Sequence, residues 1–310
     1  MVQADSSSSG DALLSIIVPV HDCRELTEAC IESLTRTVHC RHEVIVVDDA
    51  SGEETRGFLA GLGGVFRVFR QEQNLGFARS VNRGASLAEG DRLLFLNSDT
   101  VLTPGWLEPM LELLDSSPTV GAVGNVQVNP RNGLVDHAGV FFDLNGMPTH
   151  AHKNRRYPPR GAFRERKAAS AACLLMRAKV FRDFSGFDPD YRNGMEDIDL
   201  CVRLCLAGYR ILVSHRSIIL HHVSQSPGRH DHNDANSLIF ASRRAPSAIS
   251  WGRREWPVEY LRRYARYWWK IDPRLFFRAI GMILASPLTS ERKGLLIEGS
   301  GRRIVPTQQR

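Results

Sequence analysis

Short apolar runs alternate with segments of helical periodicity over the first 130 residues. The run at residues 13–20, LLSIIVPV, is rich in β-branched residues and predicts a buried strand. Similar runs predict further strands at 43–49, 66–69, 92–96 and 120–128. Between these runs the apolar residues recur at helical spacing, which predicts helices at 25–37, 53–62, 76–88 and 106–114. Because strands alternating with helices form parallel βαβ units, we predict an α/β fold whose sheet is buried on both faces.

The pattern changes in the second half of the chain. Residues 130–170 are rich in Gly, Pro, Arg and His without a clear period, which predicts a long loop region with short strands. A strand at 168–176, a turn, a helix at 196–207 and two short strands at 209–213 and 217–220 follow. From Trp251 the chain is aromatic, basic and mostly of helical character. We therefore predict a disordered lead (1–12), an α/β domain (13–242) and a helical C-terminal extension (243–310).

Composition narrows the class of protein. With 43% hydrophobic and 24% charged residues, the chain resembles an ordinary globular protein. No run approaches the roughly 18 apolar residues of a membrane-spanning helix, and the first eleven residues lack a signal-peptide pattern. The six cysteines form no C-x-x-C pair, so we expect reduced thiols and neither a zinc site nor a disulfide framework. These features together predict a cytoplasmic protein.

Charge is distributed unevenly along the chain. Residues 243–310 contain 15 Lys or Arg and 5 Asp or Glu, a net charge of +10, which leaves −4 for the remainder. Trp and Tyr mixed with Arg favour a membrane interface with anionic lipids, which would place the protein peripherally on the inner face of the membrane. Packing against the α/β domain, or an oligomer contact, explains the same pattern equally well. Nucleic-acid binding is disfavoured, because no recognition motif accompanies the charge.

Polar side chains follow the predicted strands where each strand ends. Pro19 and Val20 end the first strand, Asp48 and Asp49 end the second, and Asn97 and Asp99 follow the fourth. In α/β sheets ligands bind at the carboxyl ends of the strands. Carboxylates there can bind Mg²⁺ or Mn²⁺ or accept hydrogen bonds from a ribose or base. The alternative is that these residues only begin turns.

Two further clusters lie in the second half. Glu196, Asp197 and Asp199 open a predicted helix, where they could simply stabilise its N-terminus. Three acids so close repel one another unless a metal, a substrate hydroxyl or a basic residue such as Arg203 compensates. The pair His221 and His222 follows an apolar run, and adjacent residues of a strand point to opposite faces, so at most one faces a site.

Taken together, these segments resemble the family 2 glycosyltransferases of the GT-A fold. The segments are SIIVPVHD, VIVVDDAS, NLGFARSVNRG, LFLNSDT, GFDPDYRNGMEDIDLCVRLCLAGYRI and LHHVSQS, in order over about residues 13–225. Their character is nearest to the bacterial rhamnosyltransferase-like members that build surface polysaccharides of the cell envelope. The resemblance implies a GT-A nucleotide-binding sheet flanked by helices.

The resemblance also implies a donor site. Pro19 and Val20 would line the nucleotide pocket, and Asp48 or Asp49 would contact the base or ribose. An N-x-G-x₅-N-x-G segment near the nucleotide would contribute Asn74, Gly76 and Asn82. The donor would be a nucleotide sugar, with UDP or dTDP as its nucleotide in preference to GDP.

The catalytic residues come from the same resemblance. Asp99 matches the last acid of the family's D-x-D motif, which holds the metal, and His221 could complete the metal sphere. Asp197 matches the general base, with Glu196 and Asp199 in acceptor or supporting roles. The chain departs from the motif at its first acid.

Asn97 occupies the position of that first acid, so an amide replaces one carboxylate contact to ribose or metal. The residues matched so far imply an inverting transfer of a hexosyl or deoxyhexosyl group to a hydroxyl of a glycan or lipid-linked acceptor, with Mg²⁺ or Mn²⁺. Two alternatives stay open. A sugar nucleotidyltransferase would need a Gly-rich phosphate loop after the first strand, where this chain has PVHDCRE. A silent sugar-nucleotide or glycan-binding module would not need both Asp99 and Asp197. Processive synthesis is disfavoured, because no Q-x-x-R-W motif follows the acidic helix.

Overall fold

The computed structural model describes residues 12–223, 232–264, 269 and 271–285. Its strands are β1 (Leu14–Val20), β2 (His42–Asp49), β3 (Phe66–Gln71), β4 (Arg92–Leu96), β5 (Thr100–Leu102), β6 (Val120–Asn129), β7 (Leu134–His137), β8 (Val140–Phe142), β9 (Pro148–His150), β10 (Phe163–Arg166), β11 (Cys173–Arg177) and β12 (Arg210–His221). Its helices are α1 (Arg24–Thr37), α2 (Glu53–Ala60), α3 (Phe77–Ser86), α4 (Glu108–Asp115), α5 (Ala178–Asp183), α6 (Glu196–Leu206), α7 (Asn233–Tyr264) and α8 (Pro273–Leu284).

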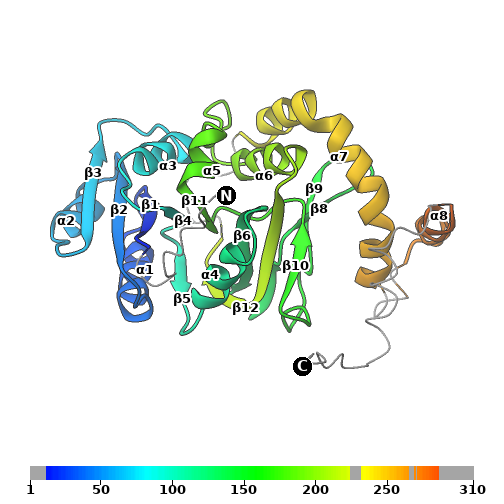
Figure 1. The fold of residues 1–310 in the computed structure, drawn as a ribbon, viewed down its shortest axis with the longest axis horizontal. Helices are drawn as coiled ribbons and strands as arrows, with labels where there is room; N and C mark the ends of the chain where they lie inside the picture. Colours follow the sequence, from blue (N-terminus) through cyan, green and yellow to red (C-terminus); the bar gives the residue numbers. More distant parts are fainter. Residues whose placement is uncertain (1–11, 224–231, 265–268, 270, 286–310) are drawn as a thin grey trace, which may run out of the picture. The chain divides into compact units, whose positions relative to one another are not determined.

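A large mixed sheet forms the centre of the fold. Its order is β10-β12-β6-β11-β4-β1-β2-β3, with β5 paired to β12 and β7 to β6 (Figure 1). Strands β3, β2, β1 and β4 pair with one another in parallel, in that order, whereas β11 runs antiparallel to both β4 and β6. Strand β12 is parallel to β6, so it points in the same direction as β4. Strands β8 and β9 form a separate hairpin.

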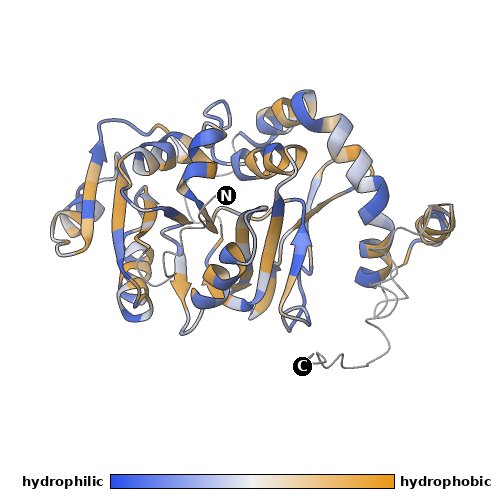
Figure 2. Cartoon of the chain, viewed as in Figure 1, coloured by the Kyte–Doolittle hydropathy of each residue, from blue (hydrophilic) through white to orange (hydrophobic). Residues whose placement is uncertain are grey.

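Helices cover both faces of the sheet, because the central strands are apolar on both sides (Figure 2). One core contains Leu34 of α1 and Met110 of α4 with alternate residues of β1. The other contains Val81 of α3, Phe181 of α5 and Leu204 of α6. The result is a three-layer α/β arrangement, as the apolar strand runs predict.

The structure corrects four details of the sequence-based prediction. The sheet is mixed and not wholly parallel, because β11 enters from a long connection and not from a crossover helix. The two short strands expected at 209–213 and 217–220 are one strand, β12, whose pairing shifts register after Ser214. Helix α5 lies between the predicted strand and the predicted turn, where no helix was expected, and α7 begins at Asn233, well before Trp251.

The chain divides into two compact units, residues 1–252 and 253–310. The predicted boundary between residues 242 and 243 falls inside α7, whose first five turns belong to the first unit. In the second unit, Asp272 caps α8 by accepting a hydrogen bond from the Arg274 backbone N–H at 2.8 Å. The predicted lead and much of the extension lie outside the described residues. Within the described part, no helix is long and apolar enough to cross a membrane.

Candidate active site

A pocket opens at the edge of the sheet where β1, β2 and β4 end. Nine of the residues selected from the sequence line it: Pro19, Val20, Asp49, Asn74, Asn97, Asp99, Glu196, Asp197 and His221. They come from strand ends, the segment before α3, the start of α6 and the end of β12. The pocket therefore joins segments as far apart in sequence as residues 19 and 221.

Antiparallel pairing explains why the second half of the chain reaches this edge. Cys173, the first residue of β11, pairs with Leu96, the last residue of β4, so the residues before β11 lie beside the residues after β4. Ser170, Ala171 and Ala172 consequently line the pocket. A hydrogen bond of 3.0 Å from the Asn97 N–H to the Ala172 carbonyl ties the two segments together. This pocket wall could not be predicted from the sequence, because one serine and two alanines carry no chemical signal.

Asp99 and His221 form a close pair in the pocket. Strand β5 pairs with β12 so that His221 lies opposite Thr100, which brings His221 Nε2 to 3.2 Å from Asp99 Oδ1. On the other side of the ring, His221 Nδ1 lies 3.0 Å from Gln127 Oε1. Burial is the largest single effect on the pKa of Asp99 and raises it, but the contact with His221, a backbone hydrogen bond and the nearby His222 together outweigh burial, so the pKa is lowered. Asp99 is therefore held as a carboxylate.

Two oxygen atoms near this pair are suited to a cation. Asn97 Oδ1 is buried and accepts no hydrogen bond from the described residues, and Asp99 Oδ1, also buried, accepts none besides its contact with His221 Nε2. Among those residues, no group of three or more His, Cys, Asp or Glu could enclose a metal ion by itself. An open set of one carboxylate, one imidazole and one amide oxygen fits a hard divalent ion that keeps waters and takes phosphate oxygens as further ligands.

Asp197 faces the same pocket from the first turn of α6. Its Oδ2 accepts a hydrogen bond from the Ala171 N–H at 2.9 Å, and its Oδ1 accepts one from the Ile198 N–H at 2.8 Å. Its neighbour Glu196 is buried and accepts from the Gly194 N–H at 2.6 Å. Both carboxylates are thus oriented by backbone donors around the start of α6, which fixes where they point.

Asp49 serves mainly to shape the pocket wall. Its carboxylate is buried and accepts hydrogen bonds from the backbone N–H groups of Leu75 at 2.7 Å and Gly76 at 2.9 Å, and from Gln71 Nε2 at 2.8 Å. Gly76 has φ +83, a left-handed conformation that favours glycine. Asp49 therefore holds the chain that carries Asn74 into the pocket.

Four of the selected residues do not line the pocket. Asp48 is buried, pairs with Arg70 and accepts from the Ser51 N–H at 2.8 Å. Asn82 exchanges two hydrogen bonds with the backbone of Phe187, at 2.7 and 2.9 Å. Gly76 lies behind Asn74, and Asp199 is buried among arginines. Of the two histidines, His221 lines the pocket and His222 does not.

A buried histidine pair behind the pocket was not selected from the sequence. His137 Nε2 accepts a hydrogen bond from the Ser170 N–H at 3.2 Å, and its Nδ1 lies 3.2 Å from His150 Nδ1. Because Nε2 accepts, neutral His137 carries its proton on Nδ1 and donates it to His150. The pair supports the backbone segment that also binds Asp197. Both residues lie in the stretch of weak periodicity, where no strand signal marks them.

Comparison with known proteins identifies the family. The profile described as Glycosyl transferase family 2 matches residues 15–184, which is more than half of the chain. The chain belongs to this family. The resemblance seen in the sequence motifs is confirmed.

Three relatives show how the similarity is distributed. The chain is 32% identical over 235 residues to an uncharacterized protein y4gI of Sinorhizobium fredii, and 30% identical over 228 residues to the O-antigen biosynthesis protein RfbC of Myxococcus xanthus. These matches cover 72% and 70% of this chain but only 26% and 18% of the relatives, so the chain spans about a quarter of the first relative and less than a fifth of the second. It is also 26% identical over 305 residues to an N-acetylglucosaminyl-diphospho-decaprenol L-rhamnosyltransferase of Mycobacterium tuberculosis, covering 88% of this chain and 94% of that protein.

Two solved structures share the fold. GalNAc-T7 with UDP, GalNAc and Mn²⁺ superposes with a TM-score of 0.59 at 16% identity, covering 77% of this chain and 51% of the other. The mannosyltransferase PcManGT from Pyrobaculum calidifontis, with GDP-Man and Mn²⁺, superposes with a TM-score of 0.56 at 18% identity, covering 93% and 79%. The predicted GT-A fold class is confirmed.

Proposed function

We propose that this chain transfers a sugar, with inversion, from a nucleotide-sugar donor to a hydroxyl group of a glycan or lipid-linked acceptor. The observation that carries the proposal is that Asp99, His221 and Asp197 face one pocket beside the strand-end residues Pro19 and Val20. Family membership supports glycosyl transfer. The names of the relatives, O-antigen biosynthesis and L-rhamnosyl transfer, support a role in surface polysaccharide synthesis and a deoxyhexose as the sugar.

The charge of the pocket supports a divalent metal as cofactor. Four carboxylates line it, from Asp49, Asp99, Glu196 and Asp197, and among the described residues no Lys or Arg does. Such a lining repels a donor diphosphate unless a cation lies between them. Asp99 and His221 would hold Mg²⁺ or Mn²⁺, with Asn97 Oδ1 beside them, and the bound ion would neutralise charge on the departing diphosphate. Both similar structures contain Mn²⁺.

Asp197 is our candidate for the general base. An inverting displacement uses a general base that accepts the proton of the attacking hydroxyl group, and a carboxylate can serve as that base. Each Asp197 oxygen receives a backbone hydrogen bond, at 2.9 and 2.8 Å, which orients the carboxylate. Glu196 is oriented by Gly194 beside it and would contact the acceptor.

The test is a donor screen followed by one substitution. Release of nucleotide from UDP-, dTDP- and GDP-sugars, with Mg²⁺ or Mn²⁺, identifies the donor; we favour UDP or dTDP. With that donor, Asp197→Asn should keep donor affinity and lower turnover by roughly 10²- to 10⁴-fold, the usual effect of losing a general base. Near-normal turnover of Asp197→Asn would refute the assignment. Donor binding without any release would favour the alternative, a silent sugar-nucleotide-binding module.

We also propose that the C-terminal unit associates with an anionic membrane surface, where a lipid-linked acceptor would be found. The support is the charge of residues 253–310, which contain 13 Lys or Arg and 5 Asp or Glu, a net +8, together with the exposed apolar residues of α8. Phe277 is 70% and Leu284 79% exposed. Arginines and apolar side chains on one short helix favour the interface of an anionic bilayer.

A further inference from the structure

The first five turns of α7 are fixed to the catalytic unit. Phe240 and Ala248 are fully buried in the core that contains α6. Gly252 approaches the Asp143 carbonyl so closely that an added Cβ would lie 1.9 Å from it. This part of α7 is therefore a rigid neighbour of α6 and of the loop that precedes it.

That loop, residues 184–195, leads directly into the pocket. Asn193 and Met195 have φ of 55 and 75, a left-handed conformation that is unfavourable for residues other than glycine. Asn193 lines the pocket and accepts a hydrogen bond from the Phe77 N–H at 3.0 Å. Because Glu196 and Asp197 follow at once, any relaxation of the loop moves both carboxylates.

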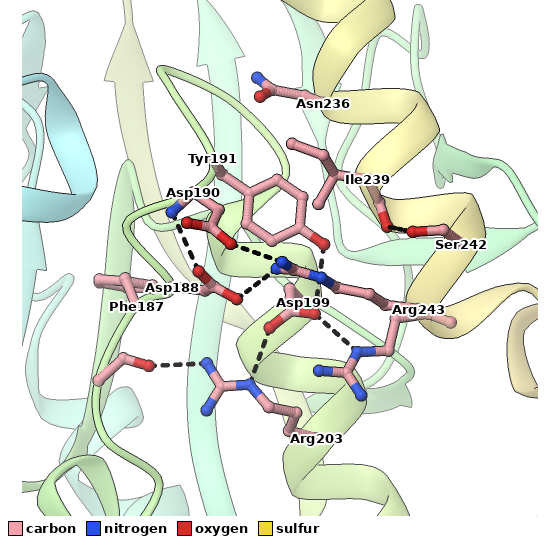
Figure 3. Close-up of polar contacts among 12 residues, drawn as sticks. Phe187, Asp188, Asp190, Tyr191, Asp199, Arg203, Asn236, Ile239, Ser242 and Arg243 are labelled. Carbon is pink, nitrogen blue, oxygen red and sulfur yellow. Dashed lines mark hydrogen bonds and ion pairs between the residues drawn. The ribbon is translucent and has the colours of Figure 1, made fainter.

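Asn236 of α7 holds the loop by its backbone. Its side-chain Oδ1 accepts from the Arg192 N–H at 3.1 Å, and its Nδ2 donates to the Arg192 carbonyl at 2.8 Å. Asn236 is 2% exposed, so these two hydrogen bonds are shielded from water. Arg243 adds surface ion pairs to Asp188 at 2.6 Å and Asp190 at 2.5 Å (Figure 3).

Arg244 of α7 holds the first turn of α6. Its Nε lies 2.7 Å from Asp199 Oδ1, while Arg203 Nε of α6 itself lies 2.8 Å from Asp199 Oδ2. Figure 3 shows Asp199 below Tyr191, with Arg203 reaching it from within α6. Asp199 is completely buried and needs one guanidinium for neutrality, which Arg203 supplies. The second guanidinium therefore serves to connect α7 to α6.

We propose that Arg244 and Asn236 are positioning residues for the transfer step. Together they hold the loop and the first turn of α6 in the arrangement that directs Asp197 and Glu196 into the pocket. Both lie beyond residues 15–184, where the family profile matches, so the similarity assigns them no role. The inference rests on the proposed function in one respect, namely that Asp197 acts in turnover.

The experiment measures nucleotide release, with water as acceptor, from the donor identified by the screen. Arg244→Ala should lower kcat by roughly 10- to 100-fold, the effect of a displaced catalytic group, while donor KM stays within about twofold. Asn236→Ala should act in the same direction. Added guanidinium ion at millimolar concentration should restore part of the activity of Arg244→Ala and none of that of Asn236→Ala. Because Arg203 still pairs with Asp199, we expect Arg244→Ala to fold.

Arg253→Ala, an exposed arginine on the same helix, is the matched control and should behave as the wild type. Unchanged kcat in Arg244→Ala, or an equal loss of kcat and donor affinity without rescue, would overturn the proposal. The result for Asp197→Asn separates the two claims. An active Asp197→Asn refutes the general-base assignment on which the inference rests, whereas an inactive Asp197→Asn with a fully active Arg244→Ala refutes only the positioning role.

Discussion

At the scale of single residues, the tautomer of His221 determines what the pair formed by Asp99 and His221 can bind. When Nδ1 carries the proton, it donates to Gln127 Oε1 at 3.0 Å, and the Nε2 lone pair faces Asp99 Oδ1 at 3.2 Å. Two acceptors at that separation repel unless a proton or a metal ion lies between them. In the proposed metal site, Gln127 would thus be the outer partner that selects the His221 tautomer able to bind the ion.

A metal requirement follows for the proposed reaction. Activity should be lost on addition of a chelator and return with excess Mg²⁺ or Mn²⁺, and Asp99→Ala should reduce turnover to background because it removes the carboxylate ligand. His221→Ala should be more damaging than His222→Ala, since only His221 lines the pocket. Nucleotide release and Mn²⁺ binding, measured separately, check both effects.

The matching control is Asp115→Ala, a surface carboxylate that pairs with Arg92 at 2.8 Å and lies on α4. It should leave both the Mn²⁺ affinity and the turnover unchanged. Full activity of the wild type in excess chelator would contradict the metal assignment. Residues outside the described pocket lining would then have to stabilise the charge of the diphosphate.

At the scale of elements, the strands of the first half could be predicted and the pocket wall could not. Runs such as residues 13–20 are apolar on both faces, so periodicity and composition predict them, and polar strand ends such as Asp49 and Asp99 predict the pocket edge. The direction of β11 is set by its pairing with β4 and β6, which local sequence does not encode. Asp48 and Asp49 are neighbours in a strand and therefore face opposite sides of the sheet. Which of the two faces the pocket depends on the tertiary arrangement, so the sequence alone does not distinguish their roles.

The β7 and β9 strands bring His137 and His150 together, and this pairing predicts how stability depends on pH. The pKa of His137 is well below its ordinary 6.5, first because the ring is buried and then because His150, His221, Arg166 and Lys153 lie near. The folded protein therefore keeps His137 neutral, whereas the unfolded chain binds a proton below about pH 6.5. The free energy of unfolding should consequently fall on acidification below that pH, by up to about 1.4 kcal/mol per pH unit for each such group.

His137→Asn isolates this contribution. Chemical unfolding measured between neutral pH and mildly acidic pH should show a smaller loss of stability in the variant than in the wild type, by about one proton taken up on unfolding. His215, whose pKa is also lowered chiefly by burial, supplies the comparison, and His215→Asn should reduce the slope likewise. Equal slopes in the wild type and His137→Asn would contradict the prediction.

At the scale of the whole molecule, the pocket residues and most of the positive charge of the C-terminal segment lie in different units. Residues with a proposed role in the pocket end at His221, and the positioning residues end at Arg244, whereas most of the +10 charge of residues 243–310 lies in the second unit. Its described part contains α8, on which Arg274, Phe277, Arg278 and Leu284 are all exposed. An apolar and basic helix surface of this kind favours a bilayer whose lipids are anionic.

The last prediction is that α8 binds membranes without affecting catalysis. The full chain should float with phosphatidylglycerol-containing vesicles and not with pure phosphatidylcholine, and added salt should weaken the binding because it screens the arginines. Phe277→Asp with Leu284→Asp should abolish flotation, since a charged group replaces each apolar one, yet leave nucleotide release unchanged. Leu238→Asp on α7, a substitution of a leucine that is 72% exposed in the first unit, is the control and should still float. Flotation that is indifferent to lipid charge, or that survives both α8 substitutions, would contradict the prediction that α8 binds anionic membranes.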